Sequence, residues 1–109
     1  MGIRTVNDIK IMIVDSKIDA SSAKETENLL IGLVEEGNKK IICDFSQTDY
    51  VSSAGLRVFL LAAKRVKQVS GKLILFSLKE RVLEVFETAG LVKLFQISSS
   101  EEEALKDAT

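Results

Sequence analysis

The stretch DFSQTDYVSSAGLRVFLLAAK, residues 44–64, decides the fold of this chain of 109 residues. It joins the end of an apolar strand pattern, KKIICDF at 39–45, to a long helical pattern at 52–71. Strand, polar loop and helix in this order are the repeating unit of α/β domains. Two serines, Ser52 and Ser53, stand where the helix should begin. Serine is a favoured helix cap at that place, and capping is the more common role there; the alternative is a hydroxyl exposed for chemistry.

The same alternation continues on both sides of this stretch. Strand patterns cover 9–14, 72–76 and 94–97, and a short strand at 2–6 joins the first through an Asn7-Asp8 turn. Helix patterns begin at two capping boxes, SAKE at 22–25 and SLKE at 77–80, and at the serines of 98–100. In the long helix, a core-facing stripe is expected at Val58, Phe59, Ala62, Val66 and Val69.

This order, strand–strand–helix–strand–helix–strand–helix–strand–helix, predicts a single α/β domain over residues 1–109. The crossovers through helices make most of the sheet parallel, whereas the first two strands form an antiparallel hairpin. We therefore expect a mixed central β-sheet covered by helices.

Composition excludes several classes of function. The chain has no histidine, which excludes a Ser-His-Asp triad and a histidine-rich zinc site, and no metal or cofactor motif replaces them. A net charge of −1 argues against direct nucleic-acid binding. The one cysteine, Cys43, cannot form an internal disulfide and is expected to be a small buried side chain. No apolar run is long enough to span a membrane, so we expect a cytoplasmic protein without a membrane partner.

The paired serines are better explained as a substrate than as a catalyst. A nucleophilic serine needs a general base, and the nearest acids are Asp44 and Asp49. A serine modified by another protein needs no base of its own. Arg57, four residues after Ser53, could reach a phosphate on it or could be an ordinary solvated arginine.

Two further residues near the serines allow two interpretations each. Asp19 is either a cap or turn acid, or a surface contact beside the Ser53 loop. Gly55 either keeps the first helical turn slim for a partner or packs against the sheet.

The segment DFSQTDYVSSAGLRVFLLA resembles the central signature of STAS domains, the fold of sulfate transporters and anti-sigma factor antagonists. The segments IVDSKIDASSA at 13–23 and GKLILFSLKERVLEVFETAGLVKLFQISSSEEEAL at 71–105 extend the resemblance over essentially the whole chain. Three positions depart from the pattern of the best-known antagonists: Ser52 replaces an aspartate, Ala54 a hydroxyl residue, and Ser16 a glycine.

The resemblance implies a free-standing anti-sigma factor antagonist rather than an enzyme. Its phosphoacceptor would be Ser53, two residues before the signature glycine, and a kinase-type anti-sigma factor would phosphorylate it. The unmodified form would bind that factor and free the sigma factor, and a serine phosphatase would restore binding after phosphorylation. The expected partner-binding residues are Asp19, Ser52, Ala54, Gly55, Leu56 and Arg57. The alternative is a STAS scaffold or subunit of a stress-sensing or lipid-transport assembly without a phosphoswitch.

Overall fold

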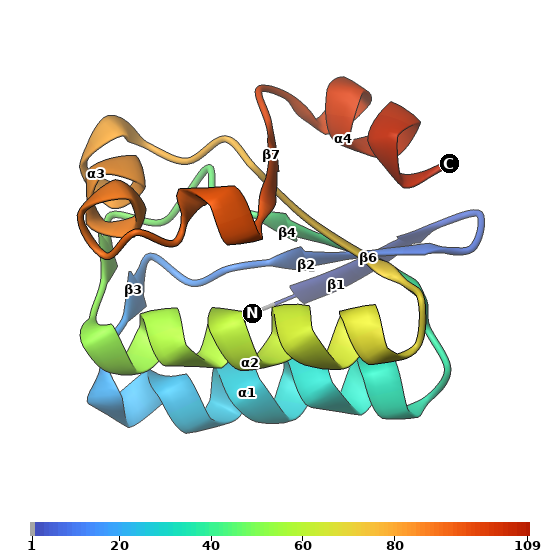
Figure 1. The fold of residues 1–109 in the computed structure, drawn as a ribbon, viewed down its shortest axis with the longest axis horizontal. Helices are drawn as coiled ribbons and strands as arrows, with labels where there is room; N and C mark the ends of the chain where they lie inside the picture. Colours follow the sequence, from blue (N-terminus) through green and yellow to red (C-terminus); the bar gives the residue numbers. More distant parts are fainter. Residues whose placement is uncertain (1) are drawn as a thin grey trace.

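The computed structural model describes residues 2–109, which form a five-stranded sheet flanked by helices (Figure 1). The spatial order of the strands is β1-β2-β4-β6-β7. Their bounds are Gly2–Val6 for β1, Ile9–Ile13 for β2, Lys40–Asp44 for β4, Lys72–Phe76 for β6 and Gln96–Ser98 for β7. The β1–β2 pair is antiparallel and the other three pairs are parallel. The predicted α/β domain with a mixed sheet is therefore confirmed.

Helices cover both faces of this sheet. The long helices α1 (Ala20–Glu35) and α2 (Ser53–Gln68) lie side by side on one face, and α4 (Glu101–Ala108) lies on the other (Figure 1). Helix α3 (Glu80–Thr88) contacts the short strand β5 (Tyr50–Val51) at one end of the sheet. Because both faces are covered, a strand such as β4 is apolar at successive residues, with Ile41, Ile42 and Cys43 all fully buried.

Four phenylalanines form the centre of the larger core. The ring of Phe45, just after β4, lies 5.1 Å from Phe59 of α2 and 6.1 Å from Phe86 of α3, between ring centroids. Phe86 lies 5.4 Å from Phe95 in an edge-to-face arrangement. These contacts fix α2 and α3 to the end of the sheet where β4 ends and the 45–49 loop begins.

The structure contains a second sheet, of two strands, that we did not predict from the sequence. Strand β3 (Lys17–Ile18) pairs in parallel with β5. Each strand has only two residues, too few for a strand pattern to be visible in sequence, and the two lie more than thirty positions apart in the chain.

Two predicted helix starts are wrong. Helix α1 begins at Ala20 behind an Asp19 cap, and Ser22 is the third helical residue rather than the cap. Helix α3 begins at Glu80 behind Lys79, with no side-chain cap, and Ser77 has a positive φ of 57°. Ser77 therefore cannot start the helix, because a helix entry requires an extended conformation at the cap.

The chain also differs from prediction near two element ends. Residues Val92–Leu94 form a short 3₁₀ helix, so the last strand starts at Gln96 rather than at 94. Helix α2 ends at Gln68, and Val69, which we predicted as part of the core-facing stripe, lies beyond the helix with 37% of its surface exposed. The other four members of that stripe are buried.

Candidate functional site

The small β3–β5 sheet brings the N-termini of α1 and α2 together. Ile18 pairs with Val51, and the Ser52 N–H donates a 2.8 Å hydrogen bond to the Ile18 carbonyl. Each strand leads within two residues into its helix, so Asp19 caps α1 and Ser52 caps α2. The predicted site residues Asp19 and Ser52 therefore start neighbouring helices.

The structure gives the two serines different roles. Ser52 has an extended backbone, with φ −82° and ψ 174°, and its Oγ accepts a hydrogen bond from the Gly55 N–H at 3.2 Å. Ser53 is the first residue of α2 and is exposed. Its hydroxyl has no hydrogen-bond partner among residues 2–109. Ser52 is thus engaged as the cap, whereas Ser53 presents a free hydroxyl beside amides that have no partner within the helix.

Asp19 is the N-cap of α1, and both its side chain and its backbone N–H form hydrogen bonds with the first turn of the helix. Its Oδ1 accepts from the Ser21 hydroxyl at 2.6 Å, the Ser21 N–H at 2.9 Å and the Ser22 N–H at 3.2 Å. In return the Asp19 N–H donates to the Ser22 Oγ, which completes a capping box. The Ser21 hydroxyl, together with these amides, holds the pKa of Asp19 below its ordinary value.

Two of the predicted partner-binding residues lie beneath the surface. Gly55 is buried, and a Cβ built on it would lie 2.7 Å from the Ile18 Cγ2 and 2.9 Å from the Val51 Cγ1. Leu56 is only 8% exposed. These residues seat the first turn of α2 on the β3–β5 pair and thereby set the position of Ser53, which supports the packing interpretation of Gly55.

The loop before β5 is held from two sides. The Thr48 hydroxyl donates to the Asp15 carbonyl at 2.8 Å, and the Asp49 N–H donates to the Ser16 carbonyl at 2.7 Å. On the other side, the Lys79 Nζ lies 2.6 Å from the Asp49 Oδ1, and this hydrogen bond lowers the pKa of Asp49. Asp49 therefore belongs to an ion pair with the start of α3 and is not a free base for Ser53.

The structure adds two residues to the site that sequence reasoning missed. Tyr50 is half exposed on β5, three positions before Ser53, and a lone tyrosine in a polar loop was the available signal. Arg81 of α3 and Ser53 both line a hollow of about 370 Å³ between α2 and α3. Nothing in the sequence indicated that Arg81 lies near Ser53, because the two residues belong to different helices, α3 and α2.

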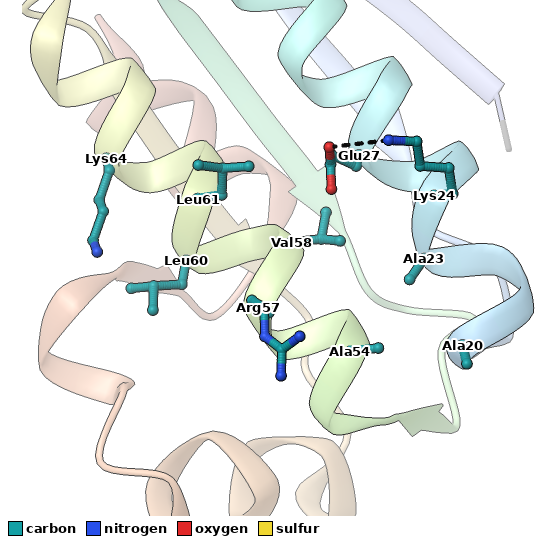
Figure 2. Close-up of a pocket in the computed structure, with 10 residues that line it drawn as sticks. All are labelled: Ala20, Ala23, Lys24, Glu27, Ala54, Arg57, Val58, Leu60, Leu61 and Lys64. Atoms are coloured by element: carbon teal, nitrogen blue, oxygen red, sulfur yellow. Dashed lines mark ion pairs between the residues drawn. The ribbon is translucent and has the colours of Figure 1, made fainter.

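Ala54 and Arg57, which we predicted as contact residues, line another hollow, between α1 and α2 (Figure 2). Ala54 is half-buried and Arg57 is exposed. Asp19, Ser53, Ala54 and Arg57 thus all retain accessible surface around the start of the two helices.

The chemistry available at this site is limited. Within residues 2–109 no three histidine, cysteine, aspartate or glutamate side chains are grouped closely enough to hold a metal ion. Cys43 is fully buried, and desolvation raises the pKa of its thiol, so it has the character of a packed core residue. The part of the chain that the structure describes also contains no helix long and apolar enough to cross a bilayer.

The fold and the site together define a small α/β domain with a mixed sheet and an exposed serine at the start of its second long helix. The sequence matches the STAS domain family over residues 1–104, and the chain belongs to this family. This confirms the resemblance drawn from the 44–62 segment.

Individual relatives match most of the chain. BtrV of Bordetella bronchiseptica is 37% identical over 99 residues, which cover 91% of this chain and 85% of that protein. The anti-sigma-B factor antagonist of Bacillus subtilis is 36% identical over 96 residues, covering 88% and 86%. The structure of the Bacillus protein SpoIIAA in its phosphorylated form superposes with a TM-score of 0.77 at 19% identity, covering 99% of this chain and 98% of that one, which shows the shared fold.

Proposed function

We propose that this chain is an anti-sigma factor antagonist that works as a phosphorylation-switched binding module in the cytoplasm. The unmodified form binds a kinase-type anti-sigma factor, phosphorylation of Ser53 releases it, and a serine phosphatase reverses the release. The observation that carries the proposal is the exposed Ser53 hydroxyl at the first position of α2, next to a Ser52 already used as the cap. The name of the Bacillus subtilis relative, an anti-sigma-B factor antagonist, supports the class of partner.

The start of α2 is a favourable place for a phosphate. A phosphoserine adds about −1.5 to −2 charges, and the positive end of a helix dipole tolerates negative charge. Because Ser53 is exposed, its phosphate stays in water and does not disturb the core. Modification therefore acts on the surface that the partner contacts and leaves the domain folded.

The proposed contact face consists of the exposed groups around Ser53. Asp19, Ala54 and Arg57 lie beside it and keep accessible surface, and Tyr50 adds a half-exposed aromatic ring. Aromatic residues and arginine are enriched among the residues that dominate binding energy at interfaces. Ser52, Gly55 and Leu56 contribute by fixing the backbone under this face.

The test is a phosphorylation assay with the kinase-type anti-sigma factor of the same organism, ATP and Mg²⁺, read by mass spectrometry. One phosphate on Ser53 is expected in the wild type and in Ser52→Ala, and none in Ser53→Ala. The Ser52→Ala variant is the matched control, because it removes the neighbouring hydroxyl and keeps the acceptor. A phosphate on Ser52, or none at all, would contradict the proposal.

Binding is measured on the same variants. Ser53→Ala should bind the anti-sigma factor as the wild type does, and the enzymatically phosphorylated wild type should not. Phosphorylated protein that still binds with unchanged affinity would leave a scaffold role on the same fold as the better explanation.

A further inference from the structure

An open groove of about 460 Å³ runs between α1 and α2, away from the β3–β5 pair (Figure 2). Ala54 and Val58 of α2 point toward α1, where Ala20 and Ala23 face them. Small side chains at these positions leave the space between the two helices unfilled. Val58 and Ala23 are 5% and 7% exposed, so the floor of the groove is apolar.

The charges on the rim of this groove are not balanced. On α1, the Lys24 Nζ lies 3.7 Å from the Glu27 Oε2, so these two charges offset each other. On α2, Arg57 and Lys64 are exposed and have no ion-pair or hydrogen-bond partner among the residues that the structure describes. Figure 2 shows both cations on the outer side of α2, with Leu60 between them. The rim therefore carries two unpaired positive charges beside an apolar strip.

The positions of these cations set the spacing of the charges they can bind. Arg57 and Lys64 are seven residues apart, which corresponds to roughly 10.5 Å along a helix axis. The α2 residues that line the groove run from Ala54 to Lys64, a length of roughly 15 Å. Between two helices, an extended segment finds no sheet edge with which its backbone N–H and C=O groups could pair. A helix of about three turns satisfies its own backbone and matches this length.

We propose that the groove between α1 and α2 binds an acidic amphipathic helix of the anti-sigma factor, with two carboxylates about seven residues apart on Arg57 and Lys64. Apolar residues between those acids fill the space over Ala23 and Val58. This inference rests on the proposed function, because the occupant is the partner that Ser53 controls.

The position of Arg57 in the groove also explains how phosphorylation of Ser53 could weaken partner binding. Ser53 precedes Arg57 by one helical turn, and helical side chains lean toward the N-terminus. A phosphate on Ser53 therefore comes close to the Arg57 guanidinium and competes with the first carboxylate of the partner. Its charge of about −1.5 to −2 also repels that carboxylate. Phosphorylation thus weakens binding at one end of the groove without changing the fold.

The experiment measures binding to the recombinant kinase-type anti-sigma factor by titration calorimetry, with a non-hydrolysable ATP analogue so that Ser53 stays unmodified. Arg57→Glu and Lys64→Glu should each weaken binding by about tenfold or more. The matched control is Lys67→Glu, which makes the same charge change at an exposed position of α2 outside the groove, and it should stay within about threefold of wild type. Circular dichroism verifies that each variant is folded.

Two further arms test the occupant. Ala20→Trp adds no charge but fills the groove from the exposed first position of α1, and it should weaken binding as strongly as the charge reversals. Raising the salt concentration should reduce the difference between wild type and Lys64→Glu, because screening weakens the charge pairs.

The possible outcomes separate this inference from the proposed function. Groove variants that bind like the Lys67→Glu control, while the phosphorylated wild type loses binding, overturn the groove and leave the phosphoswitch standing. Failure of the unmodified wild type to bind the anti-sigma factor overturns both. Self-association of the chain that Arg57→Glu abolishes identifies a second copy as the occupant and also overturns the inference.

Discussion

Substitution of Gly55 by alanine tests how the first turn of α2 is seated. The new Cβ would lie 2.7 Å from the Ile18 Cγ2 and 2.9 Å from the Val51 Cγ1, whereas ordinary contacts begin at 3.4 Å. The neighbours would therefore have to move by about 0.7 Å for the closer contact (3.4 − 2.7). Both are methyl groups on β-branched side chains that have little rotational freedom, and both side chains are buried.

The magnitude follows from two opposing contributions. Overpacking a core costs about 1–3 kcal/mol, and two stiff neighbours place Gly55→Ala in the upper part of that range. Alanine regains at most about 1 kcal/mol of helix propensity relative to glycine. We therefore expect the free energy of unfolding to fall by about 1–2 kcal/mol, with a melting temperature lower by roughly 4–8 °C for each kcal/mol.

Urea unfolding followed by far-UV circular dichroism measures this change. The matched control is Gly32→Ala in α1, where a Cβ would meet nothing within 4 Å and the backbone is helical. This control should gain about 0.5–1 kcal/mol. In addition, Ile18→Ala should reduce the cost of Gly55→Ala, because it removes the methyl group at 2.7 Å. A Gly55→Ala protein that is as stable as Gly32→Ala would refute the steric argument.

Three further predictions concern the same region. Ser52→Ala should lower the free energy of unfolding by about 1 kcal/mol, because it removes the side chain that accepts the Gly55 N–H. Ser53→Ala should change the free energy of unfolding by less than about 0.5 kcal/mol. Equal effects of the two substitutions in urea unfolding would contradict the conclusion that Ser52 is the cap and Ser53 is not. The folded-state pKa of Asp19 is depressed, so the stability advantage of wild type over Asp19→Ala should be constant above about pH 4 and decline as the pH falls further; a difference unchanged down to pH 2 would contradict it. Phe45→Ala should cost about 3–5 kcal/mol, because it leaves a cavity between Phe59 and Phe86, and chemical denaturation that shows a loss under 1 kcal/mol would disprove this central role.

Much of the site could be predicted from the sequence, because the patterns that indicate it involve residues close together in the chain. The turn from an apolar strand into a helix at Ser52 depends on residues within a few positions of each other, and the structure places the N-cap at that residue. The strand at 72–76 has the predicted bounds for the same reason. The buried Cys43 likewise follows from its place in the middle of an apolar strand.

Local signals also misled where several residues could serve the same role. Ser22 and Asp19 can both cap a helix, and the choice fell to Asp19 because the β3–β5 pairing stops the strand at Ile18. Ser77 fits a capping box in sequence, but its positive φ and the helix start at Glu80 exclude it. For Asp19, the deciding contact is the pairing of β3 with β5, which lies more than thirty positions away in the chain.

The sequence by itself determined the α/β alternation, the absence of histidine chemistry and the serine pair at the start of a helix, because periodicity, composition and capping are properties of neighbouring residues. Only the tertiary structure showed that the strands preceding Asp19 and Ser52 pair with each other, so that the two helices begin side by side. It also showed the ion pair between Asp49 and Lys79 and the groove that α1 and α2 leave beside Arg57. These features depend on sheet pairing and helix packing between residues tens of positions apart. The strand order and the volumes of the facing side chains fix such contacts, and no short segment of sequence contains them.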